Sequence, residues 1–264
     1  MGCAAALALV LAAAGAGSAP AATGDPAALQ TVTTALAGLE AQGSMSFFLS
    51  GRLRDGRDTI IVRSTGIQST SGTPKGDQRA TVTDGKVKPQ RSRTIVLGRD
   101  VYTTIPALFR DPGEKRTWLH STTEDGDDSD DPAVPFRFLA QAISATRIGR
   151  MTVRERATTG YRLVVDYRRI ARSGPPALRE AARAQAKAVA GGIERDEVWI
   201  DGEGLVRRVR LIQSNPKAKM KLTATIDALA YGVSLDGIVA PPAAKVIEED
   251  KLSSDRRTAV RGAR

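Results

Sequence analysis

The sequence predicts an α+β fold whose main element is an antiparallel β-sheet. Runs of alternating apolar and polar residues, typical of half-buried strands, outnumber the stretches with helical periodicity. Most of these runs follow one another through short turns, which favours antiparallel neighbours. The only cysteine is Cys3 and the only histidine is His120. Because such a chain has few nucleophiles or metal ligands, the composition favours binding over catalysis.

The N-terminal segment has the pattern of a signal peptide. Residues 4–14 are apolar and too few to span a bilayer, and Ala19 and Ala21 fit the small-residue cleavage pattern. We expect a signal peptide over residues 1–22 and an exported, extracytoplasmic protein of the cell envelope or periplasm, or a secreted one. No basic residue precedes the apolar run, and Cys3 lies before it rather than at the cleavage point, so lipidation there is not expected. Whether the protein is tethered to a membrane stays open.

One domain is expected over residues 23–247, with a basic, disordered tail over 248–264. In the first half of the domain, apolar residues spaced three and four apart predict a helix over residues 26–41. Asp55-Gly56 between two β-rich runs predicts a hairpin. The expected strands here are residues 44–54, 57–64, 77–83, 92–97, 101–104 and 117–120.

The second half begins after an acidic loop at residues 124–131. Helical spacing predicts a helix over residues 134–145. Pro176 and Gly191-Gly192 are start and stop signals for a second helix over residues 176–190. The expected strands are residues 150–158, 161–170, 196–201, 205–213 and 219–231, and Pro241-Pro242 ends the fold.

The net charge of +10 comes from 39 basic and 29 acidic residues. The basic residues alternate singly along the strands, as on solvent faces, and only the tail holds a dense basic run. Aromatic residues make up 4% of the chain, which leaves no stacking platform for bases. Nucleic-acid binding is therefore not expected, whereas weak, transient attraction to a membrane surface is.

The other candidate sites have plainer explanations. His120 has no second histidine or cysteine with which to hold a metal, and no Gly-x-Ser-x-Gly elbow supports a hydrolase. The acidic loop lacks the order of a calcium-binding loop. The glycines at 98 and at 202–204 do not open helices, so they are turns rather than phosphate cradles. We expect no metal, no cofactor and no enzymatic activity.

The order of several short motifs resembles the LolA-like lipoprotein carriers, and more closely the actinobacterial lipoproteins of the LppX/LprG group. The motifs are Gly98-Arg99-Asp100-Val101-Tyr102, Trp118-Leu119, the 136–145 segment, Gly160-Tyr161 through Asp166-Tyr167, residues 197–201 with 204–209, Tyr231-Gly232-Val233, and residues 238–242. This resemblance implies a strongly curved antiparallel sheet, or half-barrel, with helices covering its concave face. It also implies an apolar cavity between them that accepts acyl chains of a lipid, lipoglycan or lipoprotein.

Period-two alternation and the covering segment together define the candidate cavity residues. An ordinary packed core is the alternative for each of them. They are Phe47, Leu49, Ile60, Val62, Phe136, Leu139, Ile143, Leu163, Val165, Tyr167, Val198, Ile200, Val209, Leu211, Leu222 and Ile226, with Phe138 and Ala224 beside them.

Two functions are consistent with these features of the sequence. The first is a monomeric carrier that binds or presents acyl chains, because aliphatic walls alone can hold a chain. The second is an envelope sensor or regulatory domain of the same fold that acts through a membrane protein partner. The sequence leaves the lipid, and its donor and acceptor, undetermined.

Overall fold

The structure is a computed structural model and describes residues 24–56, 58–85, 88–105, 110, 113–122, 133–215 and 220–251. The expected signal peptide, the acidic loop at 124–131 and the part of the expected tail beyond residue 251 lie outside these ranges. The expectations for these three segments therefore stay predictions. The first residues of the expected disordered tail, 248–251, are instead ordered as the end of a strand and a 3-10 turn.

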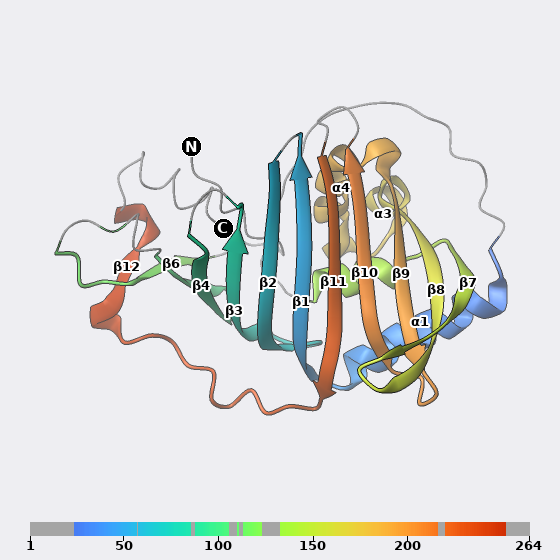
Figure 1. Cartoon of the computed structure of the whole chain (residues 1–264), viewed down its shortest axis with the longest axis horizontal. Coiled ribbons are helices and arrows are strands. Elements are labelled where there is room, and N and C mark those ends of the chain that lie inside the picture. Colours follow the sequence, from blue (N-terminus) through green and yellow to red (C-terminus); the bar gives the residue numbers. More distant parts are fainter. Residues whose placement is uncertain are drawn as a thin grey trace.

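A single twelve-stranded sheet organises the described chain (Figure 1). Its strand order is β12-β6-β5-β4-β3-β2-β1-β11-β10-β9-β8-β7, so β2 and β1 form the central pair and the sheet does not close on itself. All neighbours are antiparallel except the parallel pair β6 and β12. This confirms the α+β, curved half-barrel fold. The strands are Ser44–Asp55 (β1), Asp58–Ser69 (β2), Lys75–Thr83 (β3), Gln90–Leu97 (β4), Asp100–Thr104 (β5), Trp118–Thr122 (β6), Ser144–Val153 (β7), Arg156–Asp166 (β8), Ile193–Asp201 (β9), Val206–Asn215 (β10), Met220–Tyr231 (β11) and Val246–Glu248 (β12).

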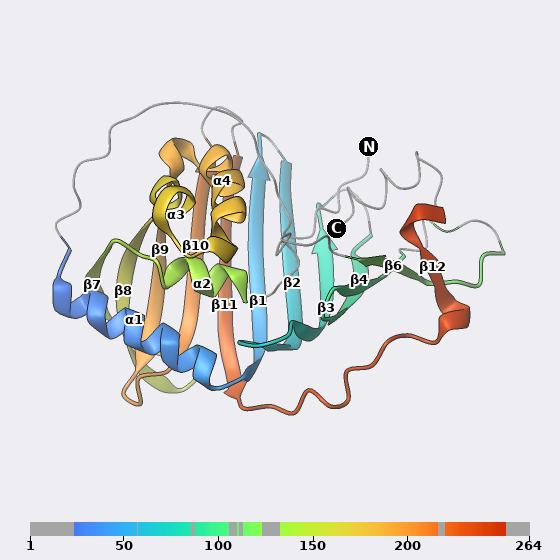
Figure 2. The ribbon, with the colours of Figure 1, turned by 180° about the vertical axis from the view of Figure 1, so that it is seen from behind.

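The four α-helices of the described residues lie together on the concave face of the sheet (Figure 2). They cover the half made of β7 to β11, whereas none of these four helices lies over β3, β4 or β6. Within the described ranges, no helix combines the length and apolarity that a bilayer crossing requires. The helices are Pro26–Ala41 (α1), Val134–Leu139 (α2), Tyr167–Ser173 (α3) and Arg179–Ala188 (α4), with short 3-10 turns at Pro176–Leu178, Ala190–Gly192, Ala243–Lys245 and Glu249–Lys251.

The first helix has the bounds that the sequence predicts. The Asp25 carboxylate accepts a hydrogen bond from the backbone N–H of Ala27 (2.9 Å), and Pro26 occupies the first helical position. Val32, Leu36 and Leu39 form its buried stripe and pack into the main hydrophobic core. Local capping and tertiary packing thus agree.

The helix predicted over residues 134–145 is wrong beyond its first half. Helix α2 ends at Leu139, and β7 begins at Ser144. The backbone N–H of Ile143 donates to Val164 (2.8 Å), so pairing with β8 replaces the helical hydrogen bonds. Long-range strand pairing overrides the local helical preference of this alanine-rich segment.

Two predicted strands also have different limits. The strand expected at residues 150–158 contains a hairpin turn at Arg154 and Glu155, whose φ angles are 46° and 69°. Neither residue is a usual choice for positive φ, so the turn leaves no sequence signal. The strand expected at 161–170 ends at Asp166, whose carboxylate caps α3 by accepting from the N–H of Arg169 (3.0 Å). Tyr167 therefore starts a helix.

His120 joins the edge strands at the far end of the sheet. Its Nε2 lies 2.9 Å from Asp100 Oδ1 on β5, and its Nδ1 lies 2.6 Å from Glu248 Oε2 on β12. The Tyr102 ring stacks on the imidazole with 4.7 Å between centroids. Partial burial lowers the pKa of His120, but the hydrogen bonds to both carboxylates outweigh it and raise the pKa above its ordinary value.

We expect the attachment of β12 to weaken as pH rises. The raised pKa means that the stabilisation is complete below the unfolded-state pKa of about 6.5 and is lost as pH rises through the folded-state value. The rate of amide hydrogen exchange at residues 246–248 should therefore rise between pH 6 and 8 by more than the intrinsic, base-catalysed exchange rate of an unprotected amide rises. His120→Asn should remove that excess, and an unchanged excess in the variant would contradict this role.

Candidate functional site

The concave face of the central strands forms a continuous apolar floor. Strand register places Ile226 of β11 opposite both Leu49 of β1 and Val209 of β10. One level along the strands, Gly51 lies opposite both Ala224 and Val62, and these rows continue through Leu211 and Val82. Directly opposed residues share one face, so the floor runs without interruption from β10 to β3.

Apolar side chains of the helices pack against one part of this floor. Phe136, Phe138 and Leu139 of α2 are buried, and the Phe138 ring meets the Tyr167 ring edge to face with 5.1 Å between centroids. Ile170 of α3 joins them in the same cluster. A dry, close-packed core therefore lies between the helices and β8 and β9.

Side-chain exposure divides the floor into two regions. Leu163 and Val198 are 0% exposed, so no solvent-sized space adjoins them. In contrast, Leu211 and Ile226 are each 9% exposed, and Leu53 and Leu222 are half-buried. The less tightly covered region, over β10, β11, β1 and β2, is called the open floor below, and it is defined by Leu49, Gly51, Leu53, Ile60, Val62, Leu211, Leu222 and Ile226.

Most of the candidate cavity residues come together in one cluster. Two do not: Ile143 lies in the connection before β7, and Leu222 is half-buried, and neither is a member of the main cluster. Whether the cluster encloses a ligand is taken up below as a proposal. The members are Phe47, Leu49, Ile60, Val62, Phe136, Leu139, Leu163, Val165, Tyr167, Val198, Ile200, Val209, Leu211 and Ile226.

Sequence reasoning missed several members of this face. Leu53 lies within a predicted strand between Arg52 and Arg54. This alternation of an apolar residue with two charged ones is consistent with its place on the floor, opposite Leu222. Gly51 has no side chain, so the alternation of apolar and polar residues cannot identify it. It nevertheless lies two residues from Leu49 in the same strand, which places it on the same face. Val82 lies on a strand whose other residues are polar or small. A single large apolar residue forms no alternating pattern, so the sequence does not show which face of the strand is buried.

Two buried acids extend the concave face next to the open floor. Glu194 and Asp196 lie opposite Val165 and Leu163, and they are 2% and 1% exposed. The ladder between β9 and β10 ends at Glu197 and Arg210, and beyond it Asp196 Oδ1 accepts from the N–H of Ile212 (3.1 Å). Tyr167 donates its hydroxyl to Glu194 Oε2, whereas Glu194 Oε1 has no partner.

Burial sets the protonation of this pair. It raises the pKa of Asp196 well above its ordinary value, and the nearby Glu194 adds to the rise. Burial also raises the pKa of Glu194, while hydrogen bonds including that from Tyr167 oppose the rise. Asp196 is therefore the carboxyl group that more readily keeps its proton. The poorly solvated surroundings that raise both pKa values also disfavour any other anion placed there.

Asp196→Asn should flatten the pH dependence of stability. A raised folded-state pKa contributes stability that is present below the unfolded-state value of about 4 and is lost as pH rises through the folded-state value. Asparagine stays neutral and can still accept from Ile212, so the variant should gain about 1–2 kcal/mol over the wild type at high pH. Urea unfolding from pH 5 to 9 measures this difference. Glu180→Gln on the exposed side of α4 is the matched control, and parallel curves for Asp196→Asn and wild type would contradict the assignment.

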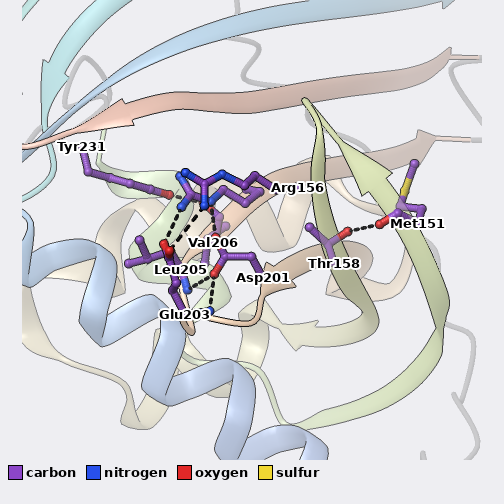
Figure 3. Close-up of polar contacts among 9 residues, drawn as sticks. Met151, Arg156, Thr158, Asp201, Glu203, Leu205, Val206 and Tyr231 are labelled. Carbon is purple, nitrogen blue, oxygen red and sulfur yellow. Dashed lines mark hydrogen bonds and ion pairs between the residues drawn. The ribbon is translucent and has the colours of Figure 1, made fainter.

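A polar cluster fixes the hairpin that joins β9 to β10 (Figure 3). Asp201 Oδ1 accepts from the backbone N–H groups of Glu203 (2.9 Å) and Leu205 (3.0 Å), and Oδ2 accepts from Arg207 Nε. The guanidinium of Arg207 also lies over the Tyr231 ring, 5.5 Å from its centroid. The pKa of Asp201 is lowered because these hydrogen bonds and Arg207 together outweigh the effect of burial.

The described residues offer no cluster that could serve as a metal centre. No group of three or more histidine, cysteine, aspartate or glutamate residues among them could hold a metal ion. His120 is engaged by two carboxylates at the sheet edge, on the opposite half of the sheet from the covering helices. The apolar floor is therefore the candidate functional site.

The fold is of the type seen in the lipoprotein-like structure LprF. The crystal structure of LprF from Mycobacterium bovis matches 83% of this chain and 99% of its own, with a TM-score of 0.50 and 14% identity. The lipoprotein LppX from Mycobacterium tuberculosis matches 80% of this chain and 100% of its own, with a TM-score of 0.45 and 12% identity. The MucA/MucB complex of Pseudomonas aeruginosa matches 80% of this chain and 61% of the other, with a TM-score of 0.34 and 14% identity. The sequence matches no family model and no curated protein.

Proposed function

We propose that this chain is an exported cell-envelope protein that binds the acyl chains of a lipid, lipoglycan or lipoprotein and carries or presents them. The observation that carries the proposal is the open floor, an apolar surface that continues past the helix-covered core. An apolar surface in a curved sheet that is covered less tightly than the rest of the core is suited to a linear hydrocarbon guest.

The energetics of the proposal need no catalytic group. Each methylene moved out of water contributes roughly 0.8 kcal/mol, so one long chain offers on the order of 10 kcal/mol before the costs of binding. Aliphatic side chains such as Ile60, Val62 and Leu222 supply this contact. The raised pKa of Asp196 and the buried Glu194 beside the floor favour an uncharged group at this end of the ligand over a carboxylate or phosphate.

A displacement assay tests the proposal. Protein stripped of lipid by organic extraction and refolded should bind a fluorescent long-chain polyene fatty acid, and a neutral monoacylglycerol should displace the probe. The monoacylglycerol should compete better than a fatty acid of equal chain length, because the burial that raises the pKa of both acids also makes a further carboxylate unfavourable there. Failure of the folded, stripped protein to take up any acyl probe would reject acyl binding and leave the sensor or regulatory function.

A further inference from the structure

Six cations gather on the outer face of the sheet, opposite the helices. Period-two alternation places Arg52, Arg54, Arg63, Arg79 and Arg91 on that face of β1 to β4, and Lys221 joins them from β11. All six are exposed, and none of them takes part in an ion pair among the described residues. They are called the basic stripe below.

The register shows that the basic stripe is continuous rather than scattered. Lys221 lies directly opposite Arg54, and Arg52 is two residues along β1 from Arg54. On the next strands, Arg63 lies opposite Thr81, which in turn lies opposite Arg91. Neighbouring strands are about 4.8 Å apart, so the stripe spans roughly 20 Å across five strands.

Carboxylates on this part of the outer face are already neutralised. The Asp77 carboxylate accepts hydrogen bonds from Nε and Nη2 of Arg93, at 2.8 and 2.7 Å. The Asp227 carboxylate accepts hydrogen bonds from Nε and Nη2 of Arg208, at 2.6 and 2.9 Å, and from Nε of Arg154. The stripe therefore keeps its full positive charge, and the direct opposition of Lys221 and Arg54 costs stability that an anionic partner would restore.

The position of the stripe selects the kind of partner. β2 and β1, which carry three of the six cations, form the central pair in the strand order (Figure 1). The middle of a convex surface is the part that touches a plane. No aromatic side chain is free there for base stacking, because Phe48 is half-buried beneath the guanidinium of Arg154, 5.3 Å from its centroid. Small polar residues such as Ser50, Thr65 and Thr81 separate the cations and suit contact with headgroup oxygens.

We propose that the basic stripe docks the outer face of the sheet on an anionic lipid bilayer, with the helix-covered face turned away from the membrane. Each cation near such a surface contributes attraction that is screened by salt. Docking uses the outer face and acyl binding uses the concave face, so neither requires the other.

Co-sedimentation with vesicles tests this assignment. The full chain should bind vesicles of equimolar phosphatidylcholine and phosphatidylglycerol, release in high salt, and ignore pure phosphatidylcholine vesicles. The triple variant Arg63→Gln, Arg79→Gln, Arg91→Gln should lower the partition coefficient on the order of 100-fold. The control Arg172→Gln, Arg183→Gln, Lys187→Gln loses the same charge from exposed positions on α3 and α4 and should lower it less than about threefold.

The outcomes separate docking from the alternatives. Equal losses in both triple variants would assign the binding to net charge and overturn the proposal, as would unchanged binding in the stripe variant. Binding of wild type to a DNA duplex but not to anionic vesicles would also overturn it. A fluorophore at Thr65→Cys, but not at Arg172→Cys, should report the membrane in a Cys3→Ser background. Lipid-stripped protein should dock as well as lipid-loaded protein, which separates this test from that of acyl binding.

Discussion

Gly51→Leu should abolish most acyl binding without unfolding the protein. A Cβ atom at Gly51 would lie 3.8 Å from Val62 Cβ and 3.9 Å from Ala224 Cβ, which is ordinary van der Waals contact. The remaining carbons of leucine would then project over the centre of the open floor and occupy the space proposed for the ligand. Removing contact with about three methylenes should weaken binding of a fluorescent acyl probe by roughly 30- to 100-fold.

The adjacent residue provides a matched control for this variant. Ser50→Leu adds a leucine to the same strand on the outer face, opposite Arg63 and Thr225, and should bind the probe as wild type does. Both variants should keep the free energy of unfolding within about 1 kcal/mol of wild type, because glycine is unfavourable in strands. Wild-type probe affinity in Gly51→Leu, or a loss of several kcal/mol in its stability, would mean that the open floor is not a ligand site.

Asp201→Ala should lower the free energy of unfolding by about 3 kcal/mol. The substitution removes the acceptor of two backbone N–H groups and leaves the Arg207 guanidinium, whose side chain is 11% exposed, without its closest carboxylate. Glu203 cannot compensate fully because its own side chain is 61% exposed. Urea denaturation followed by circular dichroism measures the change.

Two further variants separate the charge from the turn. Asp201→Asn keeps an oxygen for the N–H groups of Glu203 and Leu205 but lacks the charge, so its loss should be intermediate. Glu203→Ala removes only the exposed partner of Arg207 and should cost less than about 1 kcal/mol. If Asp201→Ala and Glu203→Ala cost the same, the buried ion pair does not hold this hairpin.

Local signals in the sequence predicted the elements whose ends are fixed locally. Asp25 and Pro26 mark the start of α1, and Asp55-Gly56 marks the turn between the first two strands. Prediction was wrong where distant parts of the chain decide. The pairing of Ile143 with Val164 shortens α2, and β12 pairs with β6 across more than a hundred residues of sequence.

The sequence predicts which residues of the candidate site share one face of the sheet, but not how far the helices bury each of them. Period-two alternation placed Leu49, Val62 and Ile226 on one face, and their register confirms this. Alternation cannot distinguish a side chain beneath a helix from one beside it, so Leu163 and Leu211 looked equivalent. Glu194 and Asp196 were missed because charged residues in a strand are expected to face solvent, whereas these share the parity of Val198.

Native mass spectrometry of the protein purified from its own envelope is the most direct measurement of acyl binding. We expect a population heavier than the polypeptide by the mass of one lipid, lost after organic extraction and diminished in Gly51→Leu but not in Ser50→Leu. A folded wild-type protein that carries no lipid mass, and that stays unloaded after incubation with envelope lipids, would contradict the proposed function.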